Sequence, residues 1–418
     1  MREYIGKGLL SAVDFDVIII GGGAAGMFAA ITAGSRGKRV ALLERNDRLG
    51  KKLRITGKGR CNVTNDCTAE DFFRNVPRNS RFLFSAVTAF PPARTKAFFE
   101  DQGCPLKTER GNRVFPVSDS AASIQEALDR GLRQARVHVV LNARVSEILT
   151  ADGAVRGVKT DKDTYYAPAV ILATGGCSYP ATGSTGDGYA LAEALGHRVI
   201  PPVGSLVPLE AAGEDCPEMQ GLSLRNVSVR LLNEKGKCVY KDFGELLFTH
   251  FGLSGPTILS ASAHMDKPGT YFISIDLKPA LEENKLNDRL LRDLEQYKNR
   301  SMANALTDLL PRSMIPVLLR RSSIPEELPA NSLTKQQRRS LLENIKNLRF
   351  EITGKRPVAE AIVTSGGVRV SEVDPKTMAS KLVGGLYLAG EMLDCDAYTG
   401  GFNLQIAWST AYAAGQAV

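Results

Sequence analysis

The hydrophobic pattern begins with a run of eighteen residues, Val17–Gly34, that contains no charged side chain. A run of this length and polarity could span a membrane if it formed one helix. It divides, however, into the β-branched stretch Val17–Ile20, a cluster of glycines and an alanine-rich stretch. The pattern therefore predicts a buried strand over 16–20, a tight turn, and a helix that runs to about Arg36.

The glycines of the predicted turn form the motif G-x-G-x-x-G, which is typical of dinucleotide-binding folds. They are Gly21, Gly23 and Gly26. The first permits a sharp turn, the second lets the backbone approach a pyrophosphate, and the third lets helix and strand pack closely. The helix N-terminus at Ala24 and Ala25 would offer free N–H groups to the phosphates. A second predicted strand ends at Glu44, where an acid can accept hydrogen bonds from a ribose.

A basic loop over 45–62, punctuated by glycines, favours FAD over NAD as the dinucleotide. NAD enzymes need no such loop at this place, whereas in a flavoprotein it can run beside the pyrophosphate and the ribityl chain. We expect its cations to balance phosphate charge and its asparagine to reach the ring edge; a solvated basic loop is the alternative. The expected cofactor contacts here are Arg45, Lys51, Lys52, Gly59, Arg60, Cys61 and Asn62.

Later elements resemble other parts of the glutathione-reductase-like FAD fold. In that fold, a strand that corresponds to the one near Val145 binds adenine through its backbone. The strand end at Thr174 and Gly175 matches the A-T-G element of the fold. The pair Gly390 and Glu391 resembles its G-D element, whose acid binds the ribityl hydroxyls, with Glu in place of Asp.

The last helix is expected to face the flavin ring. Gly401 lets the backbone come close, and Asn403 and Leu404 begin a helix whose N–H groups would point at N1 and the C2 carbonyl. Negative charge accumulates there on reduction, and a helix N-terminus stabilises such charge by roughly 0.3 to 1 kcal/mol, or about 2 when partly buried.

Composition and charge restrict the remaining possibilities. A chain of 418 residues exceeds one ordinary core, so two or three domains are expected. The net charge of +8 suits anionic partners, and part of it is local, because 311–350 contains eight basic and three acidic residues. Seven cysteines without a C-x-x-C pair indicate neither disulfides nor a zinc site. We therefore expect a cytoplasmic protein with no metal, no signal peptide and no membrane partner.

Five sequence blocks, taken together, resemble the BaiN/YhiN-type flavoprotein family over nearly the whole chain. They are VIIIGGGAAGMFAA, GKKLRITGKGRCNVTN, GGCSYPATGSTGDGYALAEALGH, GELLFTHFGLSGP and AGEMLDCDAYTGGFNLQIAWST. The resemblance implies an α/β fold, namely a discontinuous glutathione-reductase-like FAD-binding Rossmann domain with an inserted β-barrel domain that carries a helical bundle.

Short β-type runs and then helical patterns in the middle of the chain agree with such an insertion. The expected ranges are 14–198 and 369–418 for the FAD-binding domain, 199–278 for the barrel, 279–350 for the helical subdomain, and 351–368 for the return to the barrel.

The resemblance identifies the cofactor better than the substrate, since the family includes enzymes similar to bile-acid Δ4,6-reductases and to aminoacetone oxidases. The leading hypothesis is NAD(P)H-linked reduction of an activated C=C bond in a small molecule such as a 3-oxo-Δ4,6 bile acid or steroid. The first alternative is an amine oxidase that uses O2. No second G-x-G-x-x-G motif follows a strand, so NAD(P)H would be a transient donor.

Two further points concern catalysis and partners. His250 is the candidate proton donor, because it lies in the inserted domain that should cover the flavin; a structural role is the alternative. Cys61 and its nearest companion, Cys67, lie too far apart for a C-x-x-C motif, which disfavours disulfide-reductase chemistry.

A flavin-containing RNA-binding protein is the third hypothesis. We rank it below the others because no aromatic platform accompanies the basic residues of 311–350, and we leave the oligomeric state open.

Overall fold

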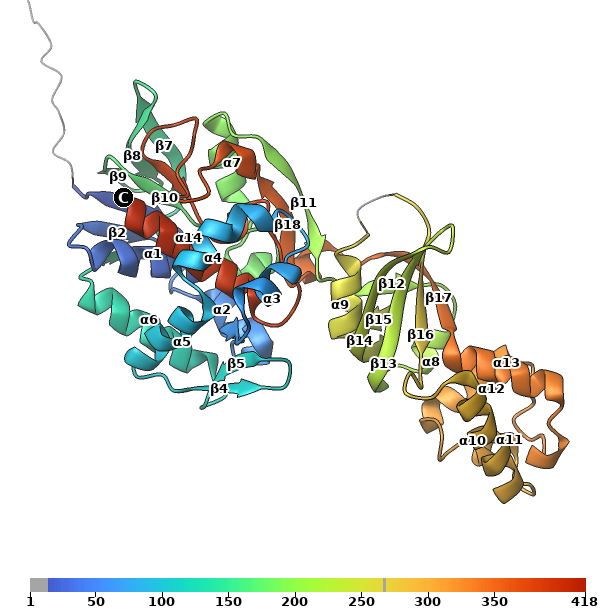
Figure 1. The fold of residues 1–418 in the computed structure, drawn as a ribbon. Helices are drawn as coiled ribbons and strands as arrows, with labels where there is room; N and C mark the ends of the chain where they lie inside the picture. Colours follow the sequence, from blue (N-terminus) through green and yellow to red (C-terminus); the bar gives the residue numbers. More distant parts are fainter. Residues whose placement is uncertain (1–13, 266–267) are drawn as a thin grey trace, which may run out of the picture. The chain divides into compact units, whose positions relative to one another are not determined.

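The computed structural model describes residues 14–265 and 268–418, which form two compact units (Figure 1). The first unit contains the described residues up to Val203 together with Ile362–Val418, and the second contains Gly204–Ala361. Among the described residues, no helix combines the length and apolar character needed to cross a bilayer. The charge-free run near the N-terminus forms a strand, a turn and a helix, as the glycine pattern predicts.

The first unit is built on a five-stranded parallel sheet. Its strands in spatial order are β19 (Leu386–Leu388), β10 (Val170–Leu172), β1 (Val17–Ile20), β2 (Val40–Leu43) and β6 (His138–Val140). β1, β2 and β10 are buried along their whole length, which explains why they appear in the sequence as continuous apolar runs. The strand order reverses at β1, because the chain adds β2 on one side and β10 on the other.

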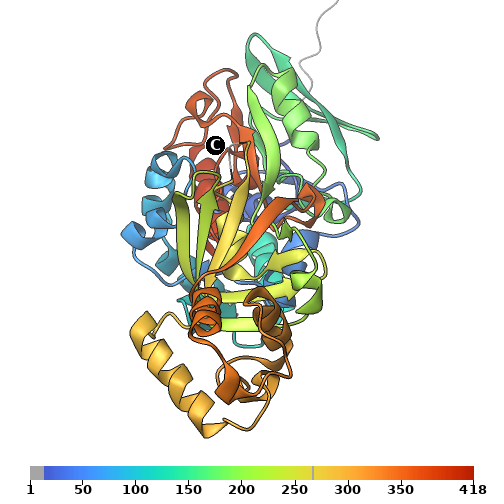
Figure 2. The same cartoon turned by 90° about the vertical axis from the view of Figure 1, so that its right-hand side faces the viewer.

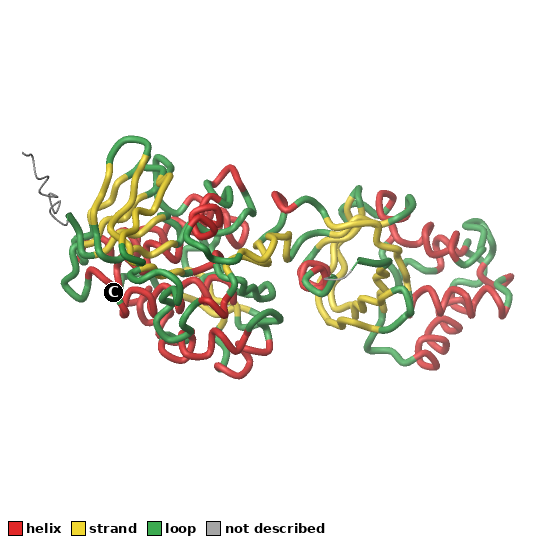
Figure 3. The backbone as a smooth tube through the Cα atoms, turned by 90° about the horizontal axis from the view of Figure 1, so that it is seen from above, coloured by secondary structure: helices red, strands yellow, loops and turns green. Residues whose placement is uncertain are grey.

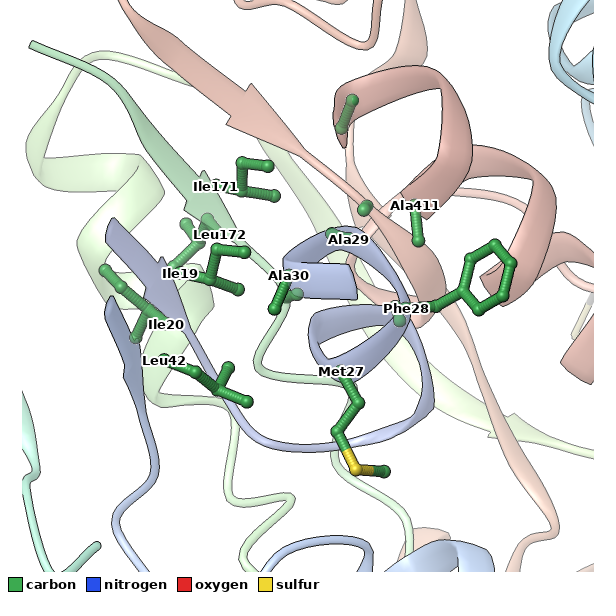
Figure 4. Close-up of a cluster of buried hydrophobic side chains, with 14 of the residues drawn as sticks. Ile19, Ile20, Met27, Phe28, Ala29, Ala30, Leu42, Ile171, Leu172 and Ala411 are labelled. Atoms are coloured by element: carbon green, nitrogen blue, oxygen red, sulfur yellow. The ribbon is translucent and has the colours of Figure 1, made fainter. Parts of the chain in front are cut away.

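Two helices pack in succession over one face of this sheet. Figure 4 shows α1 (Ala24–Gly34) between the strands that carry Ile19 and Ile171 and the helix α14 (Phe402–Ala417), which carries Ala411. Their backbones approach closely, since a Cβ added at Gly415 would lie 2.9 Å from the carbonyl oxygen of Ala29. The small residues of both helices therefore bring the two ends of the chain together.

Shorter elements surround this sheet. The helices are α2 (Lys51–Ile55), α3 (Ala69–Arg74), α4 (Phe84–Ala89), α5 (Pro92–Asp101), α6 (Ala121–Gln134) and α7 (Asp187–Ala194). The strands are β3 (Thr64–Asn65), β4 (Leu106–Glu109) and β5 (Arg113–Pro116) in one sheet, and β7 (Val145–Ala151), β8 (Ala154–Thr160) and β9 (Thr164–Tyr166) in another. β11 (Val199–Ser205) and β18 (Val363–Val368) form a two-stranded sheet. Both passages of the chain from one unit to the other therefore lie at this sheet, whereas the sequence-based ranges divide the domains at 198/199 and 368/369.

The second unit is a closed six-stranded barrel that carries helices. The barrel strands in order are β12 (Leu209–Ala211), β15 (Gly252–Ser254), β14 (Cys238–Thr249), β13 (Ser223–Asn233), β16 (Tyr271–Asp276) and β17 (Leu348–Lys355). The helices are α8 (Asp215–Glu218), α9 (Pro256–Ser262), α10 (Glu283–Gln296), α11 (Met302–Ala305), α12 (Ile315–Arg321) and α13 (Lys335–Lys346).

Barrel and helices share one hydrophobic core. Ile273 from the barrel and Leu290 and Leu341 from the helices belong to the same buried cluster. Figures 2 and 3 show the helices of 279–350 gathered at one end of the barrel. The predicted fold class, a Rossmann-type domain with an inserted barrel and helices, is confirmed.

Candidate cofactor site

The first unit has a pocket at the carboxyl ends of its central strands, where Ile20 of β1, Leu43 of β2 and Ala173 after β10 meet. The strand order reverses at β1, and open α/β sheets bind ligands at such a switch point. The residues predicted from the sequence that line this pocket are Gly21, Gly23, Ala24, Ala25, Glu44, Arg45, Lys51, Lys52, Val145, Thr174, Gly175, Glu391, Asn403 and Leu404.

The three motif glycines have three different environments. Gly21 has a φ of 104°, and a Cβ there would lie 2.5 Å from the carbonyl oxygen of Ala173. A Cβ at Gly26 would lie only 1.7 Å from the carbonyl oxygen of Gly21, so helix and strand need a glycine to pack. A Cβ at Gly23 would meet nothing within 4 Å. No side chain caps α1, which begins just after Gly23, so its first N–H groups are available to an anion.

Glu44 is buried at the end of β2 and is held by backbone and amide donors. The Gly22 N–H donates to its Oε2 at 2.7 Å, and the Asn46 backbone N–H donates to its Oε1 at 2.8 Å. The side-chain amide of Asn46 donates to the same Oε1 at 2.7 Å. A carboxylate has about four lone-pair positions, so these three bonds leave room for a ribose hydroxyl.

An ion cluster borders the pocket close to Val145. Asp187, at the start of α7, pairs with Arg45 at 2.9 Å and with Arg144 at 2.8 Å. Burial raises the pKa of Asp187, but the hydroxyl of Thr185 and the two arginines outweigh it, so that the pKa lies below its ordinary value. The arginines at this end of the pocket are therefore fixed by a carboxylate.

A second ion pair, between Lys52 and Glu391, belongs to the lining of the pocket. Lys52 Nζ is 2.7 Å from Glu391 Oε2, and each side chain is 21% exposed. The Thr364 N–H donates to Glu391 Oε1 at 2.8 Å, and the Ser178 hydroxyl donates to it at 3.2 Å. Burial raises the pKa of Glu391, but the charge and hydrogen bonds of Lys52 and the bonds from Thr364 and Ser178 lower it below its ordinary value. Lys52 thus holds the acid that is predicted to bind the ribityl chain.

The N-terminus of α14 also reaches the pocket. The helix begins at Phe402 after Gly401, which has a φ of 100°, and no side chain caps its N–H groups. The Asn403 side chain accepts from the Ala397 N–H at 2.9 Å and donates to the Ala397 carbonyl at 2.7 Å, so it orders the preceding loop. The first N–H groups of the helix therefore lie beside a pocket that Asn403 and Leu404 line.

A buried hydrogen-bond network fixes the position of this helix. Gln405 Oε1 accepts from the hydroxyls of Thr64 at 2.6 Å and Thr95 at 2.8 Å, and Gln405 Nε2 donates to the Phe90 carbonyl at 2.9 Å. Trp408 Nε1 donates to the Val63 carbonyl at 2.9 Å. No sequence motif predicts this network, because the residues that form it lie far apart along the chain.

Some predicted cofactor contacts do not line the pocket. They are Gly26, Gly59, Arg60, Cys61, Asn62, Gly390 and Gly401. Gly390 donates its N–H to the Thr410 hydroxyl at 2.9 Å, and a Cβ at Gly401 would lie 2.3 Å from the Thr64 carbonyl oxygen. These two glycines allow close packing around α14.

Arg60 and Cys61 have structural surroundings instead. The Arg60 guanidinium pairs with Glu109 and Asp119 and lies 4.1 Å from the ring centroid of Phe115, so its charge is already balanced within the protein. Cys61 is completely buried, and burial raises the pKa of its thiol to about 12. A thiol this reluctant to ionise is a poor redox nucleophile.

Asn62 carries a buried side-chain oxygen without a hydrogen-bond partner among the described residues. A buried acceptor of this kind is costly, and a donor on a bound ligand would satisfy it. Asn62 therefore stays a predicted contact of the ring edge, although it is not part of the pocket lining.

Sequence reasoning missed several residues that line the pocket. They are Asn46, Arg144, Ser184, Asp187, Cys395 and Ile406. Cys395 is buried between two aspartates, and burial, followed by the charges of Asp394 and Asp396, raises the pKa of its thiol well above the ordinary value. Asp187 lies within one of the five family blocks, so a closer reading of that block could have found it.

His250, the predicted proton donor, lies in the second unit. It is exposed in the turn between β14 and β15, and its ring centroid is 5.0 Å from that of Phe251. Its role toward a substrate stays a prediction.

The donor set of the pocket fits a dinucleotide. Open backbone at Gly23, an uncapped helix N-terminus and the buried acid Glu44 suit a pyrophosphate and a ribose. When bound, FAD supplies the two-electron chemistry. The residues of the chain bind and orient it and place the N–H groups of α14 beside the pocket.

Comparisons with known proteins agree with this geometry. The family described as HI0933-like protein Rossmann domain matches residues 15–417. A 3-dehydro-bile acid delta(4,6)-reductase of Clostridium scindens is 35% identical over 96% of this chain and 98% of its own. A ribosomal RNA dihydrouridine synthase of Escherichia coli is 33% identical over 96% of this chain and 97% of its own. A ribosomal RNA dihydrouridine synthase of Haemophilus influenzae is 32% identical over 95% of this chain and 96% of its own.

Among solved structures, the fold is similar to that of the 3-ketosteroid-delta4-(5alpha)-dehydrogenase from Rhodococcus jostii. The TM-score is 0.54 at 15% identity, with 97% of this chain and 98% of that chain covered. At such low identity the similarity concerns the fold alone.

Proposed function

The chain belongs to the HI0933-like Rossmann-domain family of flavin oxidoreductases, and from this premise we propose its reaction. It is the NAD(P)H-linked, FAD-dependent reduction of a C=C bond that is conjugated with a carbonyl group. The FAD site is the pocket of the first unit, with the glycines of the turn at the pyrophosphate, Glu44 at the ribose and Glu391 at the ribityl chain.

One observation carries this proposal: relatives with two different names share one kind of reaction. Dihydrouridine is uridine whose C5=C6 bond, conjugated with the C4 carbonyl, has been reduced. A 3-oxo-Δ4,6 bile acid has the same arrangement of alkene and ketone. In both, reduction adds a hydride to a carbon conjugated with the carbonyl and a proton completes it; in the reaction proposed here NAD(P)H supplies the electrons and is oxidised. Both matches span at least 96% of this chain, so they include both units.

As the substrate we propose, first, a uridine of ribosomal RNA. Relatives from two organisms carry that name, and the net charge of +8 suits a polyanion. The basic segment 311–350 does not support this choice, because Arg320 and Arg321 pair with Asp215 and Lys346 pairs with Asp276. RNA binding therefore needs cations outside these paired ones, such as Arg349 on strand β17.

A 3-oxo-Δ4,6 bile acid or steroid is the second candidate substrate, and the 35% identical reductase favours it. The amine oxidase alternative predicts a different electron acceptor, O2, and is therefore separable by the same experiment.

The test begins with purified holoenzyme under anoxic conditions. NADH or NADPH is expected to bleach the flavin absorbance, and the reduced enzyme is then offered two substrates in parallel, ribosomal RNA from cells that lack the gene and a 3-oxo-Δ4,6 steroid. In a separate arm, the oxidised enzyme without nicotinamide is offered aminoacetone in air. Return of the flavin colour with RNA, and a gain of two hydrogen atoms at one uridine by mass spectrometry, supports the first candidate.

The other outcomes decide against it. Return of colour with the steroid alone assigns the second candidate. Peroxide formed from the amine, without bleaching by either nicotinamide, overturns the reductase proposal altogether.

A further inference from the structure

The outer face of the barrel carries a row of polar and basic side chains across four neighbouring strands. Lys241 of β14 pairs in register with Arg230 of β13, Arg230 pairs with Ser274 of β16, and Ser274 pairs with Arg349 of β17. Residues that are directly opposite on paired strands point to the same side of a sheet. We call these four residues the barrel row; Figure 1 labels the strands that carry it.

The barrel row faces outward. Side chains alternate along each strand, and the neighbours Val229, Ile273 and Phe350 are buried in the barrel core. Lys241 and Arg349 are exposed. Arg230 is half-buried and Ser274 is only 1% exposed, so Lys241 and Arg349 are the cations of the row that the surface of the second unit presents.

The cations of the barrel row lack acidic partners. Within the described part of the chain, no ion pair involves Lys241, Arg230 or Arg349. Arg230 instead donates to the neutral oxygens Ser274 Oγ at 3.1 Å and Asn347 Oδ1 at 3.3 Å. These bonds orient the guanidinium without neutralising it. Three cations on strands spaced about 4.8 Å apart repel one another, and a polyanion would relieve that repulsion.

Two aromatic side chains flank the row on opposite sides. Phe243 pairs in register with Ser228, next to Arg230 on the same face, and is 56% exposed. On the other side, the guanidinium carbon of Arg349 lies 3.9 Å from the ring centroid of Phe272. Phe272 is half-buried, so Phe243 is the ring exposed for stacking. Cations beside an exposed aromatic ring are the combination with which proteins bind single-stranded nucleic acid, because phosphates meet the charges and bases stack on the ring.

Acidic residues also occur on this face, and one of them is neutralised by a lysine. Asp276, in register with Ser228, pairs with Lys346 at 2.6 Å. Glu351, in register with Phe272, borders the row on its far side. The centre of the face, between Phe243 and Phe272, is therefore basic.

We propose that the barrel row, with Phe243 and Phe272, is the surface that binds ribosomal RNA. The row contacts phosphates of a single-stranded segment, and at least one unpaired base stacks on Phe243. This inference rests on the proposed reduction of a uridine in RNA and names the part of the protein that holds that substrate. A steroid substrate needs no such surface.

The test compares charge-matched double variants of the holoenzyme. K241Q/R349Q removes two cations of the row, and K335Q/R339Q removes two exposed cations of α13, which lie outside the row. Affinity for protein-free ribosomal RNA is measured by fluorescence anisotropy across a salt series. For the row variant we expect roughly tenfold weaker binding, and a salt slope smaller in magnitude by about 1.4 to 1.8, because each phosphate contact contributes about 0.7 to 0.9. The α13 variant is expected to match the wild type.

A third variant separates stacking from charge. F243A is expected to weaken binding about fivefold or more with an unchanged salt slope, since stacking on an aromatic ring involves no counterion. All variants should be bleached by NAD(P)H at the wild-type rate, which verifies that the flavin site is intact.

The failures are distinguishable. A wild-type enzyme that reduces ribosomal RNA while K241Q/R349Q and F243A bind it equally well overturns this inference and leaves the proposed function in place. A wild-type enzyme that neither binds nor reduces RNA overturns this inference together with the uridine candidate on which it rests. Self-association of the wild type that F243A abolishes would assign the face to a second copy of the chain and overturn the inference as well.

Discussion

The cations of the cofactor pocket and those of the barrel face differ in their partners. In the pocket, Lys52 lies 2.7 Å from Glu391 and Arg45 lies 2.9 Å from Asp187. On the barrel face, Lys241 and Arg349 have no carboxylate partner within the described residues. The same residue types are therefore fixed in one region and left with unbalanced charge in the other.

This difference in the partners of the cations determines how each region binds an anion. Paired cations are already positioned by the fold, so the pocket offers a pyrophosphate mainly backbone N–H groups and a helix dipole. Unpaired cations lose no partner when a phosphate arrives, and counterion release favours its binding. We therefore expect changes in the pocket to alter stability and FAD affinity, and changes on the barrel face to alter RNA affinity alone.

The largest expected effect is that of Gly26→Ala, where α1 packs on β1 beneath the pocket-lining turn. The new Cβ would lie 1.7 Å from the carbonyl oxygen of Gly21, so α1 must move away from β1. We expect a loss of about 3 kcal/mol or more in the free energy of unfolding, at the upper end of overpacking effects. Urea denaturation of the FAD-free protein measures it.

Gly23→Ala is the matched control for Gly26→Ala. Its Cβ would meet no atom within 4 Å, so the FAD-free protein should unfold within about 0.5 kcal/mol of wild type. The methyl group would occupy space next to the N-terminus of α1, and FAD affinity should fall about tenfold, or about 1.4 kcal/mol. Wild-type FAD affinity in this variant would mean that the pyrophosphate binds elsewhere.

The ion pair of the pocket should have the next largest effect. Lys52→Met leaves Glu391 without its cation at a position only 21% exposed, and we expect a loss of about 2 kcal/mol. Adding Glu391→Gln should restore part of the stability, because the unpaired charge disappears. Urea denaturation of both single variants and the double variant measures the coupling. Additive effects would show that the pair contributes nothing as a pair.

Acid should weaken the first unit in two separate pH ranges. The pKa of Glu391 is lowered on folding, so its contribution to stability is present above its ordinary pKa of 4.5 and is lost as the pH falls below it. Burial lowers the pKa of His197, although Glu372 opposes this, so stability also declines as the pH falls below 6.5.

Unfolding free energies measured between pH 7 and pH 3 check this prediction. Glu391→Gln should reduce the lower step, to which Asp187 and other carboxylates with a lowered pKa also contribute, and His197→Gln should remove the upper one. A profile that neither substitution alters would assign the acid sensitivity to other groups.

Local patterns were sufficient to predict much of the fold. The run Val17–Gly34 revealed a strand, a turn and a helix because four glycines interrupt apolar residues within a few positions. The motif also indicated where the pocket would lie, since a turn that binds phosphate follows the strand directly. The inserted domain was predicted from the family resemblance. The periodicity of the sequence alone indicated only that short strands are followed by helices in the middle of the chain.

Contacts between distant residues were beyond such reasoning. Arg45 meets Asp187 across 142 positions, and Arg60 pairs with Glu109 and Asp119, which lie about 50 and 60 positions away. The barrel row is a further example, because Lys241 and Arg349 come together only through the register of four strands. The charges of the basic segment 311–350 lie close together in sequence, but Asp215 and Asp276, which lie outside the segment, pair with three of them.

The smallest expected effect is on the stability of the barrel variant K241Q/R349Q. Both side chains are exposed and lack a carboxylate partner among the described residues, so their removal deletes only the contact of Arg349 with the Phe272 ring and relieves some repulsion toward Arg230. The free energy of unfolding should stay within about 0.5 kcal/mol of wild type, with a slight gain at low salt. Urea denaturation at low and high salt measures it. A loss of more than about 1 kcal/mol would mean that these cations have structural partners, and the contrast with the pocket would disappear.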